Sequence, residues 1–374
     1  MIINELRIEN FKPFQEQVLK MKPLTLLTGL NSTGKSSVLQ SLLLLRQSYK
    51  QGLLPETGLA LNGDLVRIGT AKDALYEGAK EDLIRLIVTW KNTNWKDLDG
   101  GVWDFKYDRD SDVLNLDGIT AEECYSSSLF QDNFHYLQAE RICPKPYFEM
   151  SDFQVRQHKQ IGSKGEYTAH FLYFYQDDEI PNYKLSHHSI TSLTLLEQVQ
   201  AWMGEISPGT RIKITPNSGM DLMSLQFAYG LSNDYRSTNI GFGVTYTLPI
   251  IVAVLASKPG ALILLENPEA HLHPKGQAKI GELLALAASC GVQIIVETHS
   301  DHILNGIRLA VHDRKIKPED VQLHYFERVE KDGIAVSQVT SPNIDKNGRI
   351  DRWPDGFFDE WDKSLEALLE PTGE

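Results

Sequence analysis

Residues 29–36, Gly-Leu-Asn-Ser-Thr-Gly-Lys-Ser, constrain the fold of this chain more than any other feature of its sequence. They fit the pattern G-x-x-x-x-G-K-[ST] at every fixed position, and glycines let the backbone curl so that several N–H groups point at one phosphate chain. Residues 23–28 predict a short buried strand before the loop, and residues 37–49 predict a leucine-rich helix after it. Strand, loop and helix in this order indicate an α/β fold built around a phosphate-binding loop.

The polar residues of this loop have expected roles. Lys35 reaches the β and γ phosphates of a nucleoside triphosphate, and Ser36 offers its hydroxyl group to Mg²⁺. A glycine turn that binds nothing is the alternative, and the matching strand and helix argue against it. The predicted nucleotide-binding residues are Gly29, Asn31, Ser32, Thr33, Gly34, Lys35, Ser36 and Ser37.

A second polar cluster follows an apolar strand far downstream. Residues 261–265 are wholly apolar and lead into Glu266, which is the pattern of a buried parallel strand with a Walker B carboxylate at its end. We expect Glu266 to face the phosphate loop and to bind Mg²⁺ together with Ser36, while Glu269 polarises the attacking water. Solvated acids at a strand end are the alternative interpretation.

A third polar segment ends the next predicted strand. Residues 275–290 predict a helix, residues 292–297 predict a strand, and His299 follows soon after. A histidine at the end of a neighbouring parallel strand can contact the γ-phosphate or the attacking water, so His299 is a further catalytic candidate. A metal cage is the alternative for the histidines of this region, His271, His273, His299 and His302.

Composition limits the possible functions. The 374 residues exceed a usual single domain, and 41% hydrophobic with 23% charged residues are ordinary for a soluble globular protein. The formal net charge of −13 speaks against a generally basic nucleic-acid surface but leaves room for a local patch. The N-terminus lacks the layout of a signal peptide, and the apolar residues 247–256 are too few to cross a bilayer. We expect a cytoplasmic protein without a membrane segment.

The order of the motifs carries a family resemblance. The phosphate loop, followed by Leu-Leu-Glu-Asn-Pro-Glu-Ala-His-Leu-His-Pro and Glu-Thr-His-Ser, resembles the ATPase heads of the ABC-like group of SMC, Rad50, RecF and overcoming-lysogenization-defect proteins. Residues 347–360 resemble the C-terminal DUF3696 segment of a bacterial AAA ATPase family. The resemblance implies ATP and Mg²⁺ as cofactors. It also implies an α/β P-loop NTPase head of ABC type, with a mostly parallel sheet flanked by helices. The middle of the chain adds an expected β-rich inserted lobe and a lid helix.

The resemblance further implies that two heads close on each other around two ATP molecules. A glycine-rich turn and helix start of one head then cap the γ-phosphate held by the other head. The candidate for this signature turn precedes a predicted helix at residues 246–256 and consists of Asn239, Gly241 and Gly243. A plain strand-to-helix turn is the alternative.

One position departs from the pattern of ABC-like heads. These heads usually carry Asp-Glu where this chain has Glu266-Asn267, and an amide cannot take a proton from water. Glu269 is the nearest substitute for the general base. Otherwise hydrolysis is slow, and the head works mainly as a clamp that ATP holds shut.

The middle of the chain differs in character from its ends. Residues 1–80 and 218–374 are expected to form the ATPase head, the second part with the DUF3696-like tail, and residues 81–217 a β-rich and helical insertion. Apolar residues at helical spacing predict one amphipathic helix over residues 190–206, and core packing is favoured for it over a partner-binding face. Arg141 is interpreted as an ion-paired structural residue, and an approach to the nucleotide is the alternative. Short strands are predicted at residues 83–90, 102–107, 113–116, 167–175 and 211–215.

Three functions are compatible with the sequence. The first is an ATPase that closes as a homodimer and controls a partner effector, for which the resemblance suggests a nuclease encoded by a neighbouring gene in bacterial anti-phage defence. The second is a nucleotide-gated scaffold with little turnover, which Asn267 favours. The third is a DNA-repair head, which the acidic composition disfavours. A separate nuclease module is not evident, so we expect the chain to cut nothing itself.

Overall fold

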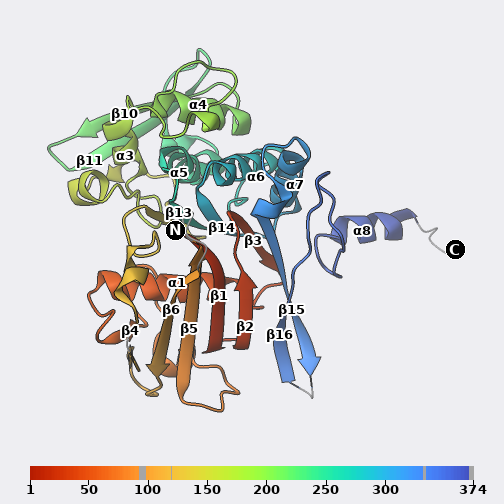
Figure 1. Cartoon of the computed structure of the whole chain (residues 1–374). Helices are drawn as coiled ribbons and strands as arrows, with labels where there is room; N and C mark the ends of the chain where they lie inside the picture. Colours follow the sequence, from red (N-terminus) through yellow and green to blue (C-terminus); the bar gives the residue numbers. More distant parts are fainter. Residues whose placement is uncertain (92–97, 119, 332–333, 370–374) are drawn as a thin grey trace.

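A six-stranded sheet forms the centre of the computed structural model, which describes residues 1–91, 98–118, 120–331 and 334–369 (Figure 1). The strands lie in the order β16-β15-β3-β14-β13-β8, and all neighbours are parallel except the edge pair β15 and β16. The predicted mostly parallel sheet is thereby confirmed. The strand bounds are β3 Leu24–Gly29, β8 Phe134–Leu137, β13 Leu262–Glu266, β14 Gln293–Glu297, β15 Val321–Lys331 and β16 Ile334–Thr340.

Helices cover both faces of the central sheet, because its inner strands are apolar on both sides. On one face, Leu264 and Ile295 share a core with the side chains of α1. On the other face, Leu265 and Val296 share a core with α5, α6 and α7. These helices are α1 Lys35–Lys50, α5 Phe242–Ala256, α6 Pro274–Ser289 and α7 Asp301–His312.

The N-terminal strands form a second sheet, antiparallel and in the order β2-β1-β5-β6. Strands from the predicted insertion therefore join the head, because β5 pairs with β1 and β8 lies in the central sheet. The division of the chain near residues 80 and 217 remains a proposal. The elements of this part are β1 Ile2–Phe11, β2 Phe14–Lys20, β4 Gly58–Ala60, α2 Ala71–Ala74, β5 Leu83–Lys91, β6 Leu98–Lys106 and β7 Val113–Asn115.

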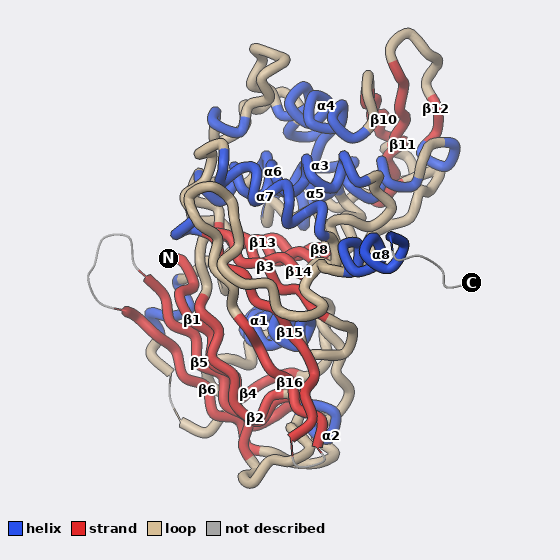
Figure 2. Tube along the Cα trace, turned by 90° about the vertical axis from the view of Figure 1, so that its right-hand side faces the viewer, coloured by secondary structure: helices blue, strands red, loops and turns tan. Residues whose placement is uncertain are grey.

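Residues 148–236, which we call the lobe, lie above the helices of the head in Figure 1 and Figure 2. Their strands form a small antiparallel sheet in which β11 pairs with β10, β12 and β9. The apolar core of the lobe is continuous with the core around α5 and α6. Its elements are β9 Phe148–Glu149, α3 Thr168–Tyr175, α4 Leu195–Ile206, β10 Thr210–Asn217, β11 Leu222–Tyr229 and β12 Tyr235–Arg236.

Two local predictions in the lobe need correction. The strand predicted at residues 167–175 is wrong, because this run forms α3 and buries Phe171 and Leu172. A short apolar run fits a buried helix as well as a strand, and tertiary packing decides between them. The helix predicted from residue 190 begins at Leu195, where the Thr194 hydroxyl donates to the Glu197 carboxylate over 3.0 Å at the first turn.

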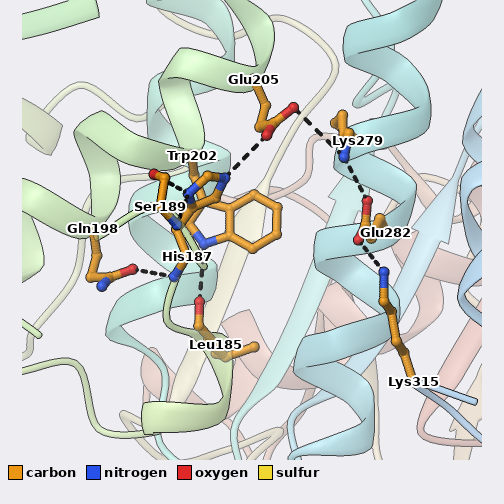
Figure 3. A network of polar contacts seen from close by, with 9 residues as sticks. All are labelled: Leu185, His187, Ser189, Gln198, Trp202, Glu205, Lys279, Glu282 and Lys315. Atoms are coloured by element: carbon orange, nitrogen blue, oxygen red, sulfur yellow. Dashed lines mark hydrogen bonds and ion pairs between the residues drawn. The ribbon is translucent and has the colours of Figure 1, made fainter. Parts of the chain in front are cut away.

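A chain of polar contacts joins the lobe to the head (Figure 3). Glu205 of α4 lies 3.2 Å from Nε2 of His187 and 3.6 Å from Nζ of Lys279 on α6. Lys279 also contacts Glu282 over 3.1 Å, and Glu282 contacts Lys315 over 2.6 Å. The lobe is thus tied to the helix that follows β13.

The last described helix, α8 Glu360–Leu369, projects to the side of the head in Figure 1. Trp361 and Leu368 of this helix are 75% and 82% exposed. No helix among the described residues combines the length and the apolar character needed to cross a membrane.

Candidate functional site

The phosphate loop connects β3 to α1 at the carboxyl edge of the central sheet. Gly29 has φ 135° and Gly34 has φ 108°, a region of backbone conformation that favours glycine. A Cβ atom on Gly29 would lie 2.0 Å from the carbonyl oxygen of Phe326, and one on Gly34 would lie 2.5 Å from the ring of Phe14. Both glycines are therefore required by backbone conformation and by close packing.

Lys35 lies inside the loop with its side chain buried. Its Nζ atom donates to the carbonyl oxygens of Gly29 and Leu30 over 3.0 and 2.5 Å. Burial lowers the pKa of the Lys35 ammonium group, and the neighbouring Glu297 carboxyl partly opposes this shift. The loop thus holds a buried cation against two of its own carbonyl oxygens.

A pocket of about 530 Å³ opens over the loop. A volume of several hundred Å³ is typical of sites that hold a ligand of nucleotide size. The opposite wall comes from the β1–β2 turn and from the segment at α2, and Lys12 on that turn donates to Gln40 of α1 over 2.8 Å. Residues lining the pocket are Lys12, Pro13, Asn31, Ser32, Thr33, Gly34, Lys35, Ser36, Ser37, Gln40, Asp73, Leu75, Glu77 and Glu297.

Two carboxylates stand side by side at the ends of β13 and β14. Glu266 and Glu297 are paired in parallel register, and Glu297 rather than Glu266 contacts Ser36, whose hydroxyl donates to its Oε1 over 3.0 Å. Oε2 of Glu297 is buried without a hydrogen-bond partner among the described residues. Burial and the charge of Glu266 raise the pKa of Glu297 to about 7. Glu297 was not among the site residues predicted from the sequence, although it ends an apolar strand in the same way as Glu266.

Glu266 directs its carboxylate toward β8. Its Oε1 accepts from the Tyr136 hydroxyl over 2.9 Å, and its Oε2 accepts from the Ala139 N–H over 3.0 Å. Burial, reinforced by the Glu266 charge, raises the pKa of the Tyr136 hydroxyl above its usual value. Both carboxylate oxygens of Glu266 are therefore engaged within the protein.

Glu269 and His299, which follow β13 and β14, are brought together, and neither lines the pocket. Oε1 of Glu269 accepts from the backbone N–H of His299 over 2.8 Å, and Oε2 accepts from the Thr298 hydroxyl over 2.7 Å. The His299 residue is exposed as a whole, but its ring is partly shielded from water. This shielding is the larger cause, and the Lys35 charge the smaller, of a lowered pKa of the His299 imidazole. Glu269 thus fixes the segment that carries His299.

Arg141 is buried between β8, β13 and α5. The predicted ion pair is wrong for the described part of the chain, because the guanidinium donates to backbone carbonyls instead. It reaches the oxygens of Glu266 and Asn267 over 2.7 Å each, that of Gln138 over 3.0 Å and that of Tyr246 over 3.1 Å. Arg141 therefore clamps the end of β13 to α5.

The candidate signature turn lies outside the pocket. Asn239 and Gly241 are exposed, and neither they nor Gly243 line the pocket at the phosphate loop. A Cβ atom on Gly243 would lie 2.4 Å from the carbonyl oxygen of His271, so glycine lets α5 start against the turn after β13.

The histidine cage has no support among the described residues. His271 packs against the Phe242 and Tyr246 rings, and His273 accepts from the Lys275 N–H at the start of α6. In the described part of the chain, the one cluster of metal-ligand type is in the lobe, at His187, His188 and Glu205.

Family models match consecutive parts of the chain. One described as "AAA ATPase domain" matches residues 1–132, and one described as "AAA domain, putative AbiEii toxin, Type IV TA system" matches residues 127–305. A third, "Protein of unknown function (DUF3696)", matches residues 316–368. No curated protein matches the chain.

Solved structures of SMC heads share the fold. An SMC head bound to the C-winged helix domain of ScpA is 15% identical with a TM-score of 0.59, covering 92% of this chain and 99% of its own. The Pyrococcus furiosus Smc head with an extended coiled coil, bound to the C-terminal domain of ScpA, is 13% identical with a TM-score of 0.54, covering 99% and 100%. The Thermotoga maritima SMC head domain is 11% identical with a TM-score of 0.50, covering 91% and 99%.

The chain has the fold of an SMC head, with a phosphate loop at the carboxyl edge of its central sheet. It is an ATPase whose sequence matches AAA domain models along most of its length and the DUF3696 model near its C-terminal end, as the resemblance of its motifs predicted.

Proposed function

We propose that this ATPase binds ATP with Mg²⁺ at the phosphate loop, closes as a homodimer around two ATP molecules, and thereby controls a partner effector. A nuclease in bacterial anti-phage defence is the effector that the family resemblance suggests. The observation that carries the proposal is the pocket over the loop. It brings together the buried Lys35, the Ser36 hydroxyl and a Glu297 carboxylate oxygen that has no hydrogen-bond partner in the described part of the chain.

The loop residues bind the phosphates in this proposal. Backbone N–H groups of residues 31–37 surround the phosphate chain, and the N-terminus of α1 adds its positive end. Lys35 exchanges the carbonyl oxygens of Gly29 and Leu30 for phosphate oxygens. The part of the pocket at Lys12 and Leu75 is left for the nucleoside.

Ser36 and Glu297 fit a Mg²⁺ ion. Magnesium prefers hard oxygen ligands, and the Ser36 hydroxyl lies beside a carboxylate whose Oε2 is buried without a partner among the described residues. When bound, the ion neutralises charge on the β and γ phosphates. Glu266, the ligand expected from sequence, has both oxygens engaged by Tyr136 and Ala139, so we assign it the supporting role of a neighbouring negative charge.

Glu269 and His299 act together in the proposed mechanism. Glu269 is a positioning residue that holds the backbone of His299, and in this proposal His299, whose ring feels the Lys35 charge, contacts the γ-phosphate. Glu269 becomes available as a general base only when its contacts with Thr298 and His299 open.

A second head supplies the remaining contacts. Asn239 and Gly241 are exposed at the start of α5 and are free to meet a phosphate presented from outside. Leu30 in the loop is 57% exposed and Phe242 beside Gly241 is 38% exposed, so each half of the composite site carries an apolar side chain for a second head to cover. The ScpA-bound SMC heads supply the analogy for a partner protein.

A nucleotide-gated scaffold is the second candidate. Asn267 stands where a proton acceptor is expected, and both oxygens of Glu269 are engaged. A head with these two features can hold ATP without turning it over quickly.

Hydrolysis of ATP across a range of protein concentrations tests the proposal, with Lys35→Ala as background. A specific activity that rises with concentration and disappears in the variant supports composite sites between two heads. ATP binding without turnover above the variant supports the scaffold. Salt-sensitive binding of DNA by the isolated protein would favour a DNA-repair head instead.

A further inference from the structure

β15 extends past the end of β3 and runs along the phosphate loop. The two strands pair in parallel from Val321 and Leu24 to Phe326 and Gly29. β3 ends at Gly29, whereas β15 continues to Lys331 and pairs there with β16. The β15–β16 hairpin lies within the DUF3696 match and leaves the head at its lower edge in Figure 1.

The loop is fastened to this extension of β15 by hydrogen bonds. The N–H of Leu30 donates to the carbonyl oxygen of Phe326 over 3.3 Å. Further along, Nη2 of Arg328 donates to the carbonyl oxygen of Ser32 over 2.6 Å. A hydrogen bond from a charged donor is roughly twice as strong as a neutral one. The C-terminal segment is therefore hydrogen-bonded to the loop at two points, Leu30 and Ser32.

The residue that Arg328 holds has an unfavourable backbone conformation. Ser32 has φ 61°, in the left-handed region that costs a residue with a side chain free energy relative to glycine. Such a conformation persists where the surroundings fix it. Arg328 is exposed, so its hydrogen bond to Ser32 forms without the cost of burying a charge.

We propose that Arg328 is a positioning residue for the nucleotide. By holding the carbonyl oxygen of Ser32, it keeps the loop in the curvature that receives phosphate. Through the same hydrogen bond, binding of nucleotide at the loop stabilises the β15–β16 hairpin. This part of the DUF3696 segment therefore responds to whether ATP is bound. The inference rests on the proposed function that the loop binds ATP.

Binding of a non-hydrolysable ATP analogue with Mg²⁺ to the full chain tests this role. Arg328→Ala is expected to weaken binding on the order of tenfold, since a charge-assisted hydrogen bond is lost. Arg109→Ala is the matched control, because Arg109 is also exposed and does not line the pocket, and we expect wild-type affinity. The melting temperature of the nucleotide-free protein should be the same in all three proteins.

A second substitution separates positioning from simple attraction of phosphate. Glycine adopts φ 61° without strain, so Ser32→Gly should restore most of the affinity in the Arg328→Ala background. If Arg328→Lys restores affinity and Ser32→Gly does not, the cation acts directly on the phosphates and the positioning role is overturned.

Hydrogen exchange at residues 326–331 and 334–340 tests the coupling. The analogue should slow exchange there in the wild type and leave it unchanged in Arg328→Ala. If the wild-type protein binds the analogue and exchange in the hairpin does not change, the coupling is overturned. If Arg328→Ala binds the analogue with wild-type affinity, the positioning role is overturned. A wild-type protein that binds no ATP would instead refute the proposed function itself.

Discussion

The carboxyl edge of the central sheet and the lobe are held together by different means. The edge buries Lys35 and Glu297 and keeps Ser32 and Asn267 in left-handed backbone conformations. The lobe also has left-handed residues, Lys159 and Asp221, but its core is apolar, and one of its charged contacts, between Glu205 and Lys279, crosses to α6. Buried charges lower stability and are typical of ligand sites. The comparison indicates that the lobe stabilises the fold, whereas the edge gives up stability for binding.

Arg141 holds the end of β13 at the carboxyl edge against α5, so its replacement should have the largest effect on stability. Arg141→Met leaves carbonyl oxygens of residues 138, 246, 266 and 267 without their donor. The expected loss is about 3–5 kcal/mol in the free energy of unfolding, because buried polar groups become unsatisfied. Chemical denaturation measures this loss. Arg141→Lys should recover only part of it, and a near-neutral Arg141→Met would refute the clamp.

A cavity in the lobe should separate stability from nucleotide binding. Met203 of α4 is fully buried, and Met203→Ala is expected to cost about 2–4 kcal/mol through lost packing. ATP affinity of the folded variant should be unchanged, because the lobe does not line the pocket. Calorimetry on the same sample gives both quantities. If Met203→Ala instead weakens ATP binding with little loss of stability, the lobe contributes to binding rather than to stability.

The sequence could predict the edge because phosphate chemistry restricts residue types. Gly29, Gly34 and Lys35 are required by close packing and charge, and these requirements leave a readable pattern. The mostly parallel sheet followed from apolar strands that end in polar residues. The partner of Ser36 could not be predicted, because Glu266 and Glu297 end their strands alike and only the side-chain directions distinguish them.

Part of the lobe and the C-terminal hairpin were not predictable for a different reason. The run at residues 168–175 is mostly apolar and aromatic, so periodicity cannot separate a helix from a strand, and packing against α4 and α5 decides. Arg328 reaches Ser32 only because β15 extends beyond the end of β3. The register between these two strands is set by pairing of residues far apart in sequence.

Glu297 should make the nucleotide-free protein less stable as the pH rises. Its pKa in the folded state is about 7 against 4.5 for the ordinary group, so the folded state binds its proton more tightly than the unfolded state. The free energy of unfolding begins to decrease as the pH rises above the pKa of the unfolded state. The decrease is complete above about pH 8, where it approaches about 3 kcal/mol. Glu297→Gln should remove it.

Denaturation of both proteins without nucleotide and Mg²⁺, at pH 5 and pH 8.5, measures this effect. The gain in stability of Glu297→Gln should grow from under about 1 kcal/mol to about 3 kcal/mol between these values. A gain that is equal at both values would mean that packing rather than ionisation is responsible. In the same variant, Mg²⁺ should no longer strengthen ATP binding.

Replacement of Lys279 should have the smallest effect on stability, and it tests whether the lobe is independent of nucleotide binding at the edge. Lys279→Ala removes the contact with Glu205 that joins α4 to α6, together with the contact with Glu282 within α6. These side chains are partly exposed, so the loss should be only about 0.5–1 kcal/mol and should shrink in high salt. Urea denaturation at two salt concentrations resolves it. If Lys279→Ala instead changes ATP affinity while stability stays constant, the lobe takes part in nucleotide binding through α6, and its separation from the edge fails.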